Sequence, residues 1–370
     1  MRILYVLDEF GRQTAGTEGQ FLELVRGMRA RQADVRVTLL RASPELELGD
    51  VPTQVLGLRS LGSVSAIGAM WRLATAANAA RVDVAHLFFN DASIVCPIPL
   101  RIAGIPVIVS RRDLGFWYTP AALRILRVNR RAVSKVVANS HAVKHQVVGQ
   151  EGYPESKVVV IPNGWRPREV CGDRAEVRSA LGMPSTARML LTVANLRPLK
   201  RVDDAMRIAA LALEHEPDVW LAVVGADRWG GSERERLGAL ARELGITERV
   251  VFAGERSDPW PIISVCDIGL LCSESEGLSN TLIEYSAAYR PVVCTSVGGN
   301  GEVIADSLSG YLYPPGDVEQ AAARVVELLR NPELSLRMGA AGRQLVQSRF
   351  GIDQMVESHL QLYAAVAQRI

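Results

Sequence analysis

The chain has 370 residues, of which 48% are hydrophobic, and it carries 42 basic and 40 acidic side chains. This composition is typical of a soluble globular enzyme, and it excludes a disordered chain, a collagen-like repeat and a disulfide scaffold. At roughly 150 residues per domain, the length predicts two domains, each large enough to bury its own core.

Short β-branched runs alternate with amphipathic stretches along the chain, a pattern that predicts parallel strands joined by helices. The predicted strands cover residues 2–7, 34–40, 83–89, 106–110, 134–140 and 157–162, then 188–195, 219–225, 249–254, 266–272 and 291–296. Each half therefore has a complete set of such units, so we expect an α/β protein with two doubly wound, Rossmann-like domains facing one another across a cleft. Ligands should bind at the carboxyl ends of the strands.

The first loop follows a strand and opens a helix, and Gly11, Gly16 and Gly19 would let its backbone approach a ligand. The spacing is not G-x-G-x-x-G, which a nicotinamide dehydrogenase would normally show together with an acid about 20 residues later. An oxidoreductase is therefore poorly supported. Taken alone, such a loop is more often structural than functional.

A basic segment, residues 111–135, has seven basic side chains and three aromatic ones against a single acid. Arg124, Arg127 and Arg131 recur at helical spacing, which predicts one basic helix face that could contact an anionic membrane surface. Residues 1–170 carry a net charge of +8 and residues 171–370 one of −6. Nucleic acid is a weaker candidate, since no helix-turn-helix, RNA-binding or zinc-finger signature is present. An ordinary solvated helix explains the segment nearly as well.

The segment from Asn163 to Pro184 is polar and has no strand pattern, so we predict the interdomain linker there. The five cysteines contain no C-x-x-C pair, and an odd number cannot all pair within one chain, which favours a reducing compartment and no structural zinc. Asp8 and Glu9 interrupt the first apolar run before a signal peptide could form. No apolar run approaches the roughly 18 residues of a membrane span. We therefore expect a cytoplasmic protein.

Asn195, Arg197 and Lys200 follow the strand at 188–195, and a helix should begin near Val202. Two cations at the carboxyl end of a strand can neutralise a diphosphate without a metal, arginine by a bidentate fork and lysine as a point charge. The alternative is that they only add surface solubility. Lysine occurs four times in the whole chain, so its presence here mildly favours a role.

Glu276 and Glu284 are eight residues apart, a spacing that chance alone produces about one to two times among 24 glutamates. The positions of the two glutamates relative to the predicted strand and helix are more informative than their spacing. Glu276 follows the buried-looking strand at 266–272, Ser279 or Asn280 should cap a helix, and Glu284 falls about one turn inside it. A diphosphate could meet the helix N-terminus while each glutamate accepts hydrogen bonds from sugar or ribose hydroxyls, a pattern that fits a nucleotide-sugar.

Several motifs in the right order resemble the retaining GT-B glycosyltransferases of glycosyltransferase family 4, over nearly the whole chain. AGTEGQFLELVRGM looks like the family's G-G-x-E loop, and VANLRPLKRVDD resembles its V-G-x-L-x-x-x-K segment. EGLSNTLIE matches the E-x7-E signature. VVANSHAV, VVVIPNG, PVVCTSVGGNGEVI and SGYLYPPGD continue the pattern, and SRFGIDQMVESHLQLY resembles the family's last helix.

The resemblance implies three parts: residues 1–165 as the acceptor-side domain, 185–345 as the nucleotide-sugar domain, and 346–370 as a helix that crosses back to the first domain. Glu284 would hold the ribose, Glu276 the donor sugar, and Arg197 with Lys200 the leaving diphosphate. Gly16 would clear space for the donor phosphates. Further donor-side candidates are Asn195, Arg256, Gly277, Leu278, Ser279 and Asn280.

The sequence departs from the family pattern on the acceptor side, where Arg112 precedes Asp113 although many relatives have His-Asp. His86 matches another family histidine, although a hydrogen-bonded histidine at a strand end is an equally good explanation. His86, Arg112 and Asp113 are thus the acceptor-side candidates. Tyr289 stands where the family usually has glycine, and Asn195 where arginine is common.

The resemblance implies a retaining hexosyltransferase that moves a sugar from a nucleotide diphosphate donor to a hydroxyl acceptor, and we expect UDP rather than GDP as the nucleotide. The resemblance implies no metal and no cofactor. The basic segment suggests a lipid-linked or cell-surface saccharide as acceptor, a place in polysaccharide biosynthesis, and peripheral attachment to the inner membrane face. The alternatives are a nucleotide-sugar epimerase of the same fold and a non-catalytic binding module.

Overall fold

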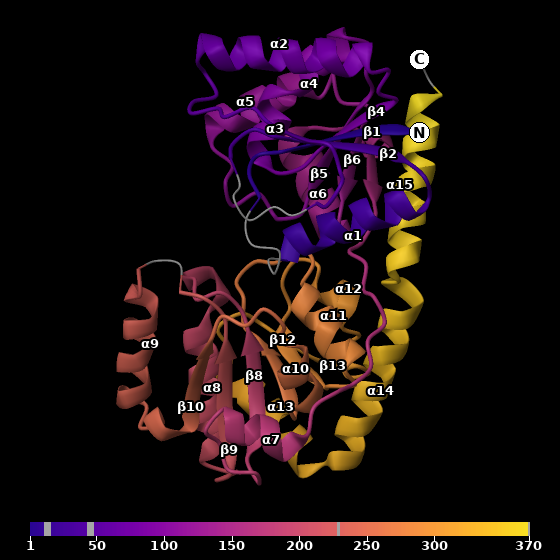
Figure 1. The fold of residues 1–370 in the computed structure, drawn as a ribbon. Helices are drawn as coiled ribbons and strands as arrows, with labels where there is room; N and C mark the ends of the chain where they lie inside the picture. The colour runs from indigo at the N-terminus through magenta and orange to yellow at the C-terminus, as the bar shows by residue number, and fades with distance from the viewer. Residues whose placement is uncertain (11–15, 43–47, 228–229, 369–370) are drawn as a thin grey trace. The chain divides into compact units, whose positions relative to one another are not determined.

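The computed structural model describes residues 1–10, 16–42, 48–227 and 230–368 (Figure 1). The chain forms two compact units, one comprising Met1–Gly164 with Ile352–Ile370 and the other Trp165–Gly351. Each unit contains one sheet whose paired strands all run parallel, with helices on its faces. The predicted α/β class with two doubly wound sheets is confirmed.

The sheet of the first unit has seven strands in the order β3-β2-β1-β4-β5-β6-β7. Its strands are β1 (Arg2–Leu7), β2 (Asp34–Leu39), β3 (Thr53–Val55), β4 (Val84–Leu87), β5 (Val107–Arg111), β6 (Lys135–Ala138) and β7 (Val158–Val160). The strand order reverses direction between β1 and β4. Such a switch point leaves a crevice at the carboxyl ends of the two strands.

The helices of the first unit cover both faces of this sheet. They are α1 (Gly16–Ala30), α2 (Val64–Ala79), α3 (Asn90–Val95), α4 (Pro97–Ile102), α5 (Pro120–Asn129), α6 (His141–Gln146) and α15 (Ile352–Ala367), with a π-helical turn at Val147–Glu151 and a 3-10 turn at Glu155–Lys157. The alternation in β1 decides which face each side chain joins. Ile3 and Tyr5 belong to the core under α1 and α15, while Leu4 and Val6 belong to the core under α2 and α4.

Helix α15 belongs to the first unit although it ends the chain, and it lies against α1 (Figure 1). Gly27 of α1 makes the close approach possible, because a Cβ atom there would overlap the side chain of Val356. Met355, Val356 and Tyr363 are buried in the same core as β1. The last helix therefore completes the core that the first strand begins.

The sheet of the second unit has six strands in the order β10-β9-β8-β11-β12-β13. Its strands are β8 (Arg188–Val193), β9 (Val219–Val224), β10 (Val250–Gly254), β11 (Ile268–Leu271), β12 (Val292–Thr295) and β13 (Gly310–Tyr313). Its helices are α7 (Arg174–Ala180), α8 (Val202–Leu213), α9 (Ser232–Glu243), α10 (Trp260–Val265), α11 (Asn280–Ala287), α12 (Asn300–Val303), α13 (Val318–Arg330) and α14 (Pro332–Arg349), with 3-10 turns at Pro198–Lys200 and Thr247–Arg249. The order reverses between β8 and β11, which gives this unit its own switch point.

All eleven predicted strands are present, and the sequence analysis missed two more, β3 and β13. Both are edge strands of three or four residues. The residues of β3 are exposed, so the strand lacks the apolar alternation by which strands are recognised.

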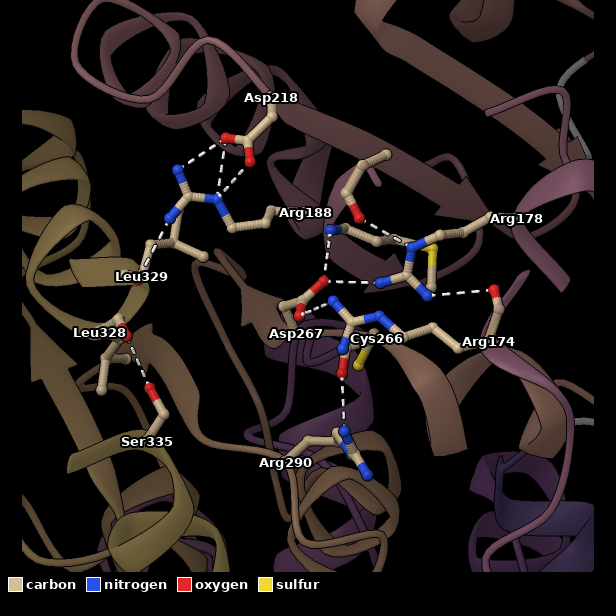
Figure 2. A network of polar contacts seen from close by, with 12 residues as sticks. Arg174, Arg178, Arg188, Asp218, Cys266, Asp267, Arg290, Leu328, Leu329 and Ser335 are labelled. Atoms are coloured by element: carbon tan, nitrogen blue, oxygen red, sulfur yellow. Dashed lines mark hydrogen bonds and ion pairs between the residues drawn. The ribbon is translucent and has the colours of Figure 1, made fainter. Parts of the chain in front are cut away.

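The second unit begins at Trp165, and the segment predicted as the linker, Asn163 to Pro184, contains helix α7. Figure 2 shows what fixes this helix. The fully buried guanidinium of Arg178 donates to a carboxylate oxygen of Asp267 at 2.7 Å and to the carbonyl of Ala187 at 2.8 Å. Arg174 donates to the other oxygen of Asp267, and the same carboxylate accepts the backbone N–H of Met189.

This network lies at the amino ends of β8 and β11, where Figure 2 also shows two further anchors. Arg290 donates to the carbonyl of Cys266 at 3.0 Å. Arg188 pairs with Asp218 and donates to the carbonyl of Leu329 at 3.1 Å. The amino end of the sheet is thus closed by structural ion pairs, and the opposite end remains for a ligand.

The second boundary also differs from the sequence prediction, since α14 continues to Arg349 within the second unit and the first unit resumes at Ile352. Across the described ranges, no helix is long and apolar enough to cross a membrane. All five cysteine thiols are free: Cys96, Cys171, Cys266, Cys272 and Cys294.

Candidate functional site

The candidate site lies at the switch point of the second sheet, where β8 and β11 separate. These strands pair only at Ile268 with Leu190 and at Gly269 with Leu191. Beyond this the hydroxyl of Tyr285 donates to the carbonyl of Leu191 at 2.8 Å and accepts the N–H of Val193 at 3.0 Å. Helix α11 is thereby fixed in the opening between the strands.

The loops that follow β8 and β11 are joined by an ion pair. The Lys200 ammonium lies 2.6 Å from a carboxylate oxygen of Glu276, and the Ser273 hydroxyl donates to the same oxygen at 2.7 Å. The side chains of Lys200 and Glu276 are 27% and 11% exposed, so both remain within reach of a ligand. Glu276 therefore has a cation beside it before any donor binds.

Two other residues predicted for this site lie in the loop after β8. Arg197 is exposed, and its guanidinium makes no hydrogen bond or ion pair with the part of the chain that the structure describes. Asn195 is half-buried at the carboxyl end of the same strand. Helix α8 begins at Val202, as predicted. Of the two predicted cations in this loop, Lys200 is paired and, among the described residues, Arg197 is not.

Helix α11 starts at the position that the sequence predicts. Ser279 is its N-cap, with its hydroxyl accepting the N–H of Leu282, and Asn280 is its first residue. Gly277, Leu278 and Ser279 are buried. The helix N-terminus, which carries partial positive charge, therefore follows Glu276 directly in the chain.

Glu284 lies on the second turn of α11, and its carboxyl group makes no hydrogen bond within the described residues. Burial raises the pKa of its carboxyl group to about 7, an effect that the positive charge of Arg168 partly offsets and the negative charge of Asp258 reinforces. Arg168 cannot neutralise Glu284 fully, because its guanidinium is paired with Asp258 at 2.6 and 3.0 Å. Glu284 therefore has unused hydrogen-bonding capacity.

Arg256 follows β10 and is exposed. The order of the sheet places β10 at its edge, two strands away from β8. Arg256 thus shares the carboxyl edge with Lys200 and Glu276, although no contact joins it to them within the described ranges.

Gly16 is the first residue of α1 and is exposed, so it does not belong to the loop in which the sequence analysis placed it. Residues 11–15, which include Gly11, lie outside the described residues. At the switch point of this first sheet, Asp8 accepts the N–H groups of Asn90, Asp91 and Ala92 at 2.6 to 3.0 Å. Asp8 therefore occupies the amino end of α3, where an anion would otherwise bind.

His86, predicted as an acceptor-side candidate, is fully buried, and both of its ring nitrogens are hydrogen-bonded. Its Nδ1 lies 2.6 Å from the hydroxyl of Tyr363, and its Nε2 lies 2.8 Å from the hydroxyl of Ser110. Burial and the nearby His359 and Arg112 lower its pKa well below the usual value, so the ring is neutral. His86 is a hydrogen-bonded core residue, which is the alternative that the sequence left open.

Arg112 and Asp113 are both half-buried at the carboxyl end of β5. Arg112 donates to the side-chain oxygen of Asn163 at 2.7 Å, and its guanidinium lies 5.3 Å from the centre of the Phe88 ring. Asp113 accepts the N–H of Gly115 at 2.7 Å, and burial raises its pKa. Both remain candidates for the acceptor side.

The predicted basic helix face is incomplete. Helix α5 ends at Asn129, so Arg131 lies beyond the helix. Arg127 donates twice to the carbonyl of Gln150, at 2.9 and 3.1 Å, which fixes its guanidinium against the π-helical turn. Arg124 and Arg131 are exposed.

Tyr289 has a φ of +59°, a conformation that glycine adopts readily and a tyrosine does not. This explains why glycine is usual at this position in the resembling family. The strain is held in place by the packing of α14, where Gly339 lies so close that a Cβ atom would overlap the carbonyl of Tyr289. The Arg343 guanidinium lies 5.3 Å from the centre of the tyrosine ring.

Three residues of this site were not predicted from the sequence. Ser273 and Tyr285 carry no distinguishing sequence signal, because a hydroxyl becomes informative only when its partner is known. Arg168 lies in the segment taken for a linker, 116 positions before Glu284, so only the folded chain brings their charges together. Within the described residues, no group of three or more His, Cys, Asp or Glu side chains could hold a metal ion.

Two family models match the chain, one over each half. "Glycosyltransferase Family 4" matches residues 14–168, and "Glycosyl transferases group 1" matches residues 173–345. Together they include every residue singled out above for the site around Lys200 and Glu276.

Curated relatives carry glycosyltransferase names. N-acetyl-alpha-D-glucosaminyl L-malate synthase of Bacillus anthracis is 30% identical over 191 residues, which are 52% of this chain and 49% of that protein. A D-inositol 3-phosphate glycosyltransferase of Thermomonospora curvata is 31% identical over 267 residues, 67% of this chain and 61% of that protein. The chain thus spans about half to three fifths of the length of these two relatives. An enzyme of the same name from Thermobispora bispora is 27% identical across 98% of this chain and 86% of its own.

Solved structures show the same fold over the whole chain. HepE of Anabaena in complex with UDP has a TM-score of 0.87 at 21% identity, with 99% of this chain and 100% of that chain covered. Sucrose-phosphate synthase of Thermosynechococcus elongatus has a TM-score of 0.82 at 18% identity, with both chains fully covered. At these identities the likeness concerns the fold alone.

Proposed function

Because the chain belongs to the glycosyltransferases of family 4 and group 1 and has their GT-B fold, we propose that it is a retaining glycosyltransferase with a nucleotide diphosphate-sugar as donor. We propose UDP as the nucleotide, and the structurally similar HepE was solved in complex with UDP-glucose. The acceptor is a hydroxyl group.

The observation that carries the proposal is the ion pair of Lys200 with Glu276 at the switch point, with the unpaired Arg197 in the same loop. A diphosphate brings negative charge that Arg197 and the remaining N–H groups of Lys200 can bind. The N-terminus of α11 adds partial positive charge. Glu276 would accept hydrogen bonds from the donor sugar, and Glu284 from the two ribose hydroxyls.

In the proposed reaction, the bond between the sugar C1 and the departing phosphate oxygen breaks as the bond to the acceptor oxygen forms. The acceptor proton passes to the departing phosphate oxygen on the same face of the sugar, which gives retention of configuration. Arg197 and Lys200 stabilise the negative charge that develops on the diphosphate. No metal is required in this proposal, because these two cations take the role that a metal would have.

The first test is the melting temperature with UDP, GDP or NAD, each in the presence of a metal chelator. A ligand at about 100 times its Kd adds roughly 2.7 kcal/mol to the free energy of unfolding, which moves the midpoint by several degrees. We expect UDP to stabilise the wild type and Glu243→Ala, an exposed position on α9, but not Glu284→Ala. If UDP and GDP leave the wild type unmoved, the donor site is refuted and a non-catalytic binding module is favoured.

A second measurement separates transfer from epimerisation. With UDP-glucose and no acceptor, a transferase should return the donor unchanged apart from slow hydrolysis, whereas an epimerase would convert the sugar. Conversion without an acceptor would therefore overturn the transferase proposal and support the epimerase.

We further propose a lipid-linked saccharide as acceptor, met at an anionic membrane surface inside the cell. Support comes from the basic segment, where Arg124 and Arg131 are exposed together with Phe116, Ile125 and Val128, at 68%, 43% and 62% exposure. Cations beside exposed apolar side chains are typical of surfaces that bind anionic lipids. Vesicles with phosphatidylserine should bind the wild type at low salt and the double variant Arg124→Gln/Arg131→Gln more weakly. Equal binding of both proteins, or none, would refute the membrane proposal.

A further inference from the structure

Two consecutive arginines at the end of β5 have opposite electrostatic surroundings. Arg111 is 4% exposed and holds both carboxylate oxygens of Glu151, at 2.7 and 2.9 Å. Arg112 has no carboxylate partner among the described residues, and its one hydrogen bond with a side chain goes to the neutral Asn163. Its Nε is buried and has no acceptor. The positive charge of Arg112 is therefore uncompensated.

The groups that face Arg112 from the surrounding elements supply no negative charge. After β4 it meets the ring of Phe88, and after β6 the amide of Asn139 donates to the Arg112 carbonyl at 3.3 Å. From α15 come His359, whose buried Nε2 has no partner, and Tyr363. Burial lowers the pKa of His359 to about 4, with Arg112 adding to the effect, so His359 is neutral.

A half-buried guanidinium without a counter-charge is costly, since removal from water is not repaid by an ion pair. Burial accordingly lowers the pKa of Arg112 to about 10. A protein keeps such a group where a ligand supplies the missing charge, and perturbed ionisable groups do concentrate at functional sites. The position agrees with this explanation, because Arg112 and Asn163 follow β5 and β7 at the carboxyl edge of a parallel sheet, where ligands bind.

We propose that Arg112 binds a carboxylate or phosphate group of the acceptor, with Asn163 holding the guanidinium in place, so that this chain acts on an anionic acceptor. The planar guanidinium can donate two parallel hydrogen bonds to either group. The identification of the ligand as the acceptor rests on the proposed function, whereas the anion site itself does not depend on it. A histidine, which many members of the resembling family have here, is mostly neutral at pH 7, whereas the guanidinium of Arg112 keeps its charge and therefore favours an anionic group at this position.

The anion site can be tested without knowing the acceptor. The probes are inorganic phosphate, malonate as a dicarboxylate, and glycerol as a neutral hydroxyl compound, all at constant ionic strength. The melting temperature is measured for the wild type, Arg112→Gln, Arg112→Lys and the control Arg72→Gln, which removes an exposed guanidinium from α2. Because phosphate can also enter the donor site, the difference between wild type and Arg112→Gln is the quantity of interest.

We expect phosphate, malonate or both to stabilise the wild type and Arg72→Gln, and to bind Arg112→Gln at least about tenfold more weakly. Arg112→Lys should recover part of the affinity, since lysine keeps the positive charge but cannot donate two parallel hydrogen bonds as the guanidinium does. A response to phosphate alone identifies a phosphorylated acceptor, and a response to malonate alone a carboxylate. In buffer without either anion, Arg112→Gln should melt at the wild-type temperature or above it, because the substitution removes an uncompensated charge.

Two outcomes would overturn the inference. Equal stabilisation of wild type and Arg112→Gln would show that the anion binds elsewhere, and a lower melting temperature of Arg112→Gln without anion would make Arg112 a structural residue. UDP binding distinguishes failure of the inference about Arg112 from failure of the proposed function. If Arg112→Gln weakens UDP, the group belongs to the donor and the acceptor assignment is wrong. If phosphate stabilises through Arg112 while UDP binds neither protein, the anion site stands and the transferase proposal fails.

Discussion

Replacement of Glu284 by glutamine tests the electrostatics of the site through stability as well as binding. Burial raises the pKa of Glu284 from 4.5 to about 7, so the folded protein holds a proton that the unfolded chain has lost between these pH values. The stability that this carboxyl group contributes is therefore fully present below pH 4.5 and is lost as the pH rises through about 7. At 1.36 kcal/mol for each pKa unit, the loss is at most about 3 kcal/mol.

Glu284→Gln has the same shape but cannot ionise, so it avoids this loss. We expect the variant and the wild type to melt at similar temperatures near pH 4.5, and the variant to melt several degrees higher at pH 8. For a unit of this size, 1 kcal/mol corresponds to roughly 2 to 4 °C. UDP should stabilise the variant much less than the wild type, because an amide oxygen replaces the carboxylate that the ribose hydroxyls would bind.

The assay is thermal unfolding at pH 4.5, 6 and 8, with Glu243→Gln as the control for an exposed glutamate. The control should follow the wild type at every pH. If Glu284→Gln melts below the wild type at pH 8, or differs from it by the same amount at all three pH values, the carboxylate is not strained by burial and the reasoning is refuted.

Substitutions at three further positions test the framework of the site. Asp267→Asn leaves the fully buried Arg178 without its counter-charge, which should lower the free energy of unfolding by about 3–5 kcal/mol. The melting temperature should fall, while UDP still binds at the opposite end of the sheet. An unchanged melting temperature would contradict this expectation. Tyr285→Phe removes the hydroxyl that serves two backbone groups of β8, and urea unfolding should show a loss of about 1–3 kcal/mol with the same m-value. Tyr289→Gly relieves the positive φ and should stabilise the protein by up to about 1 kcal/mol, whereas Tyr289→Ala, which keeps the strain, should not.

Much of the fold could be predicted because buried parallel strands leave a strong local signal. The run Ile268–Leu271 is apolar throughout, and its four residues are buried in the centre of a sheet. β3 could not be found in this way, since its exposed residues pair only along their backbone. Helix α7 was missed because its anchor is an arginine bound to a distant aspartate, which no local pattern records.

The candidate site shows the same limit. Lys200 and Glu276 could be selected individually from their places after two strands, but their ion pair depends on the order of the strands in the sheet, which brings β8 beside β11. The end of α5 was also beyond reach. Asn129, the last residue of that helix, donates from its side-chain amide to the carbonyls of Ser93 and Ile94, and Arg131 lies beyond the helix.

The return of α15 to the first unit has a consequence for how the protein is made. The second unit, Trp165–Gly351, is one uninterrupted stretch of chain, and all of it is synthesised before α15. The first unit needs residues from both sides of this stretch, since Met355, Val356 and Tyr363 of α15 pack in the same core as β1. We therefore expect the first unit to remain incomplete until the whole second unit has been synthesised, with one side of its core open to chaperones or to aggregation until α15 leaves the ribosome.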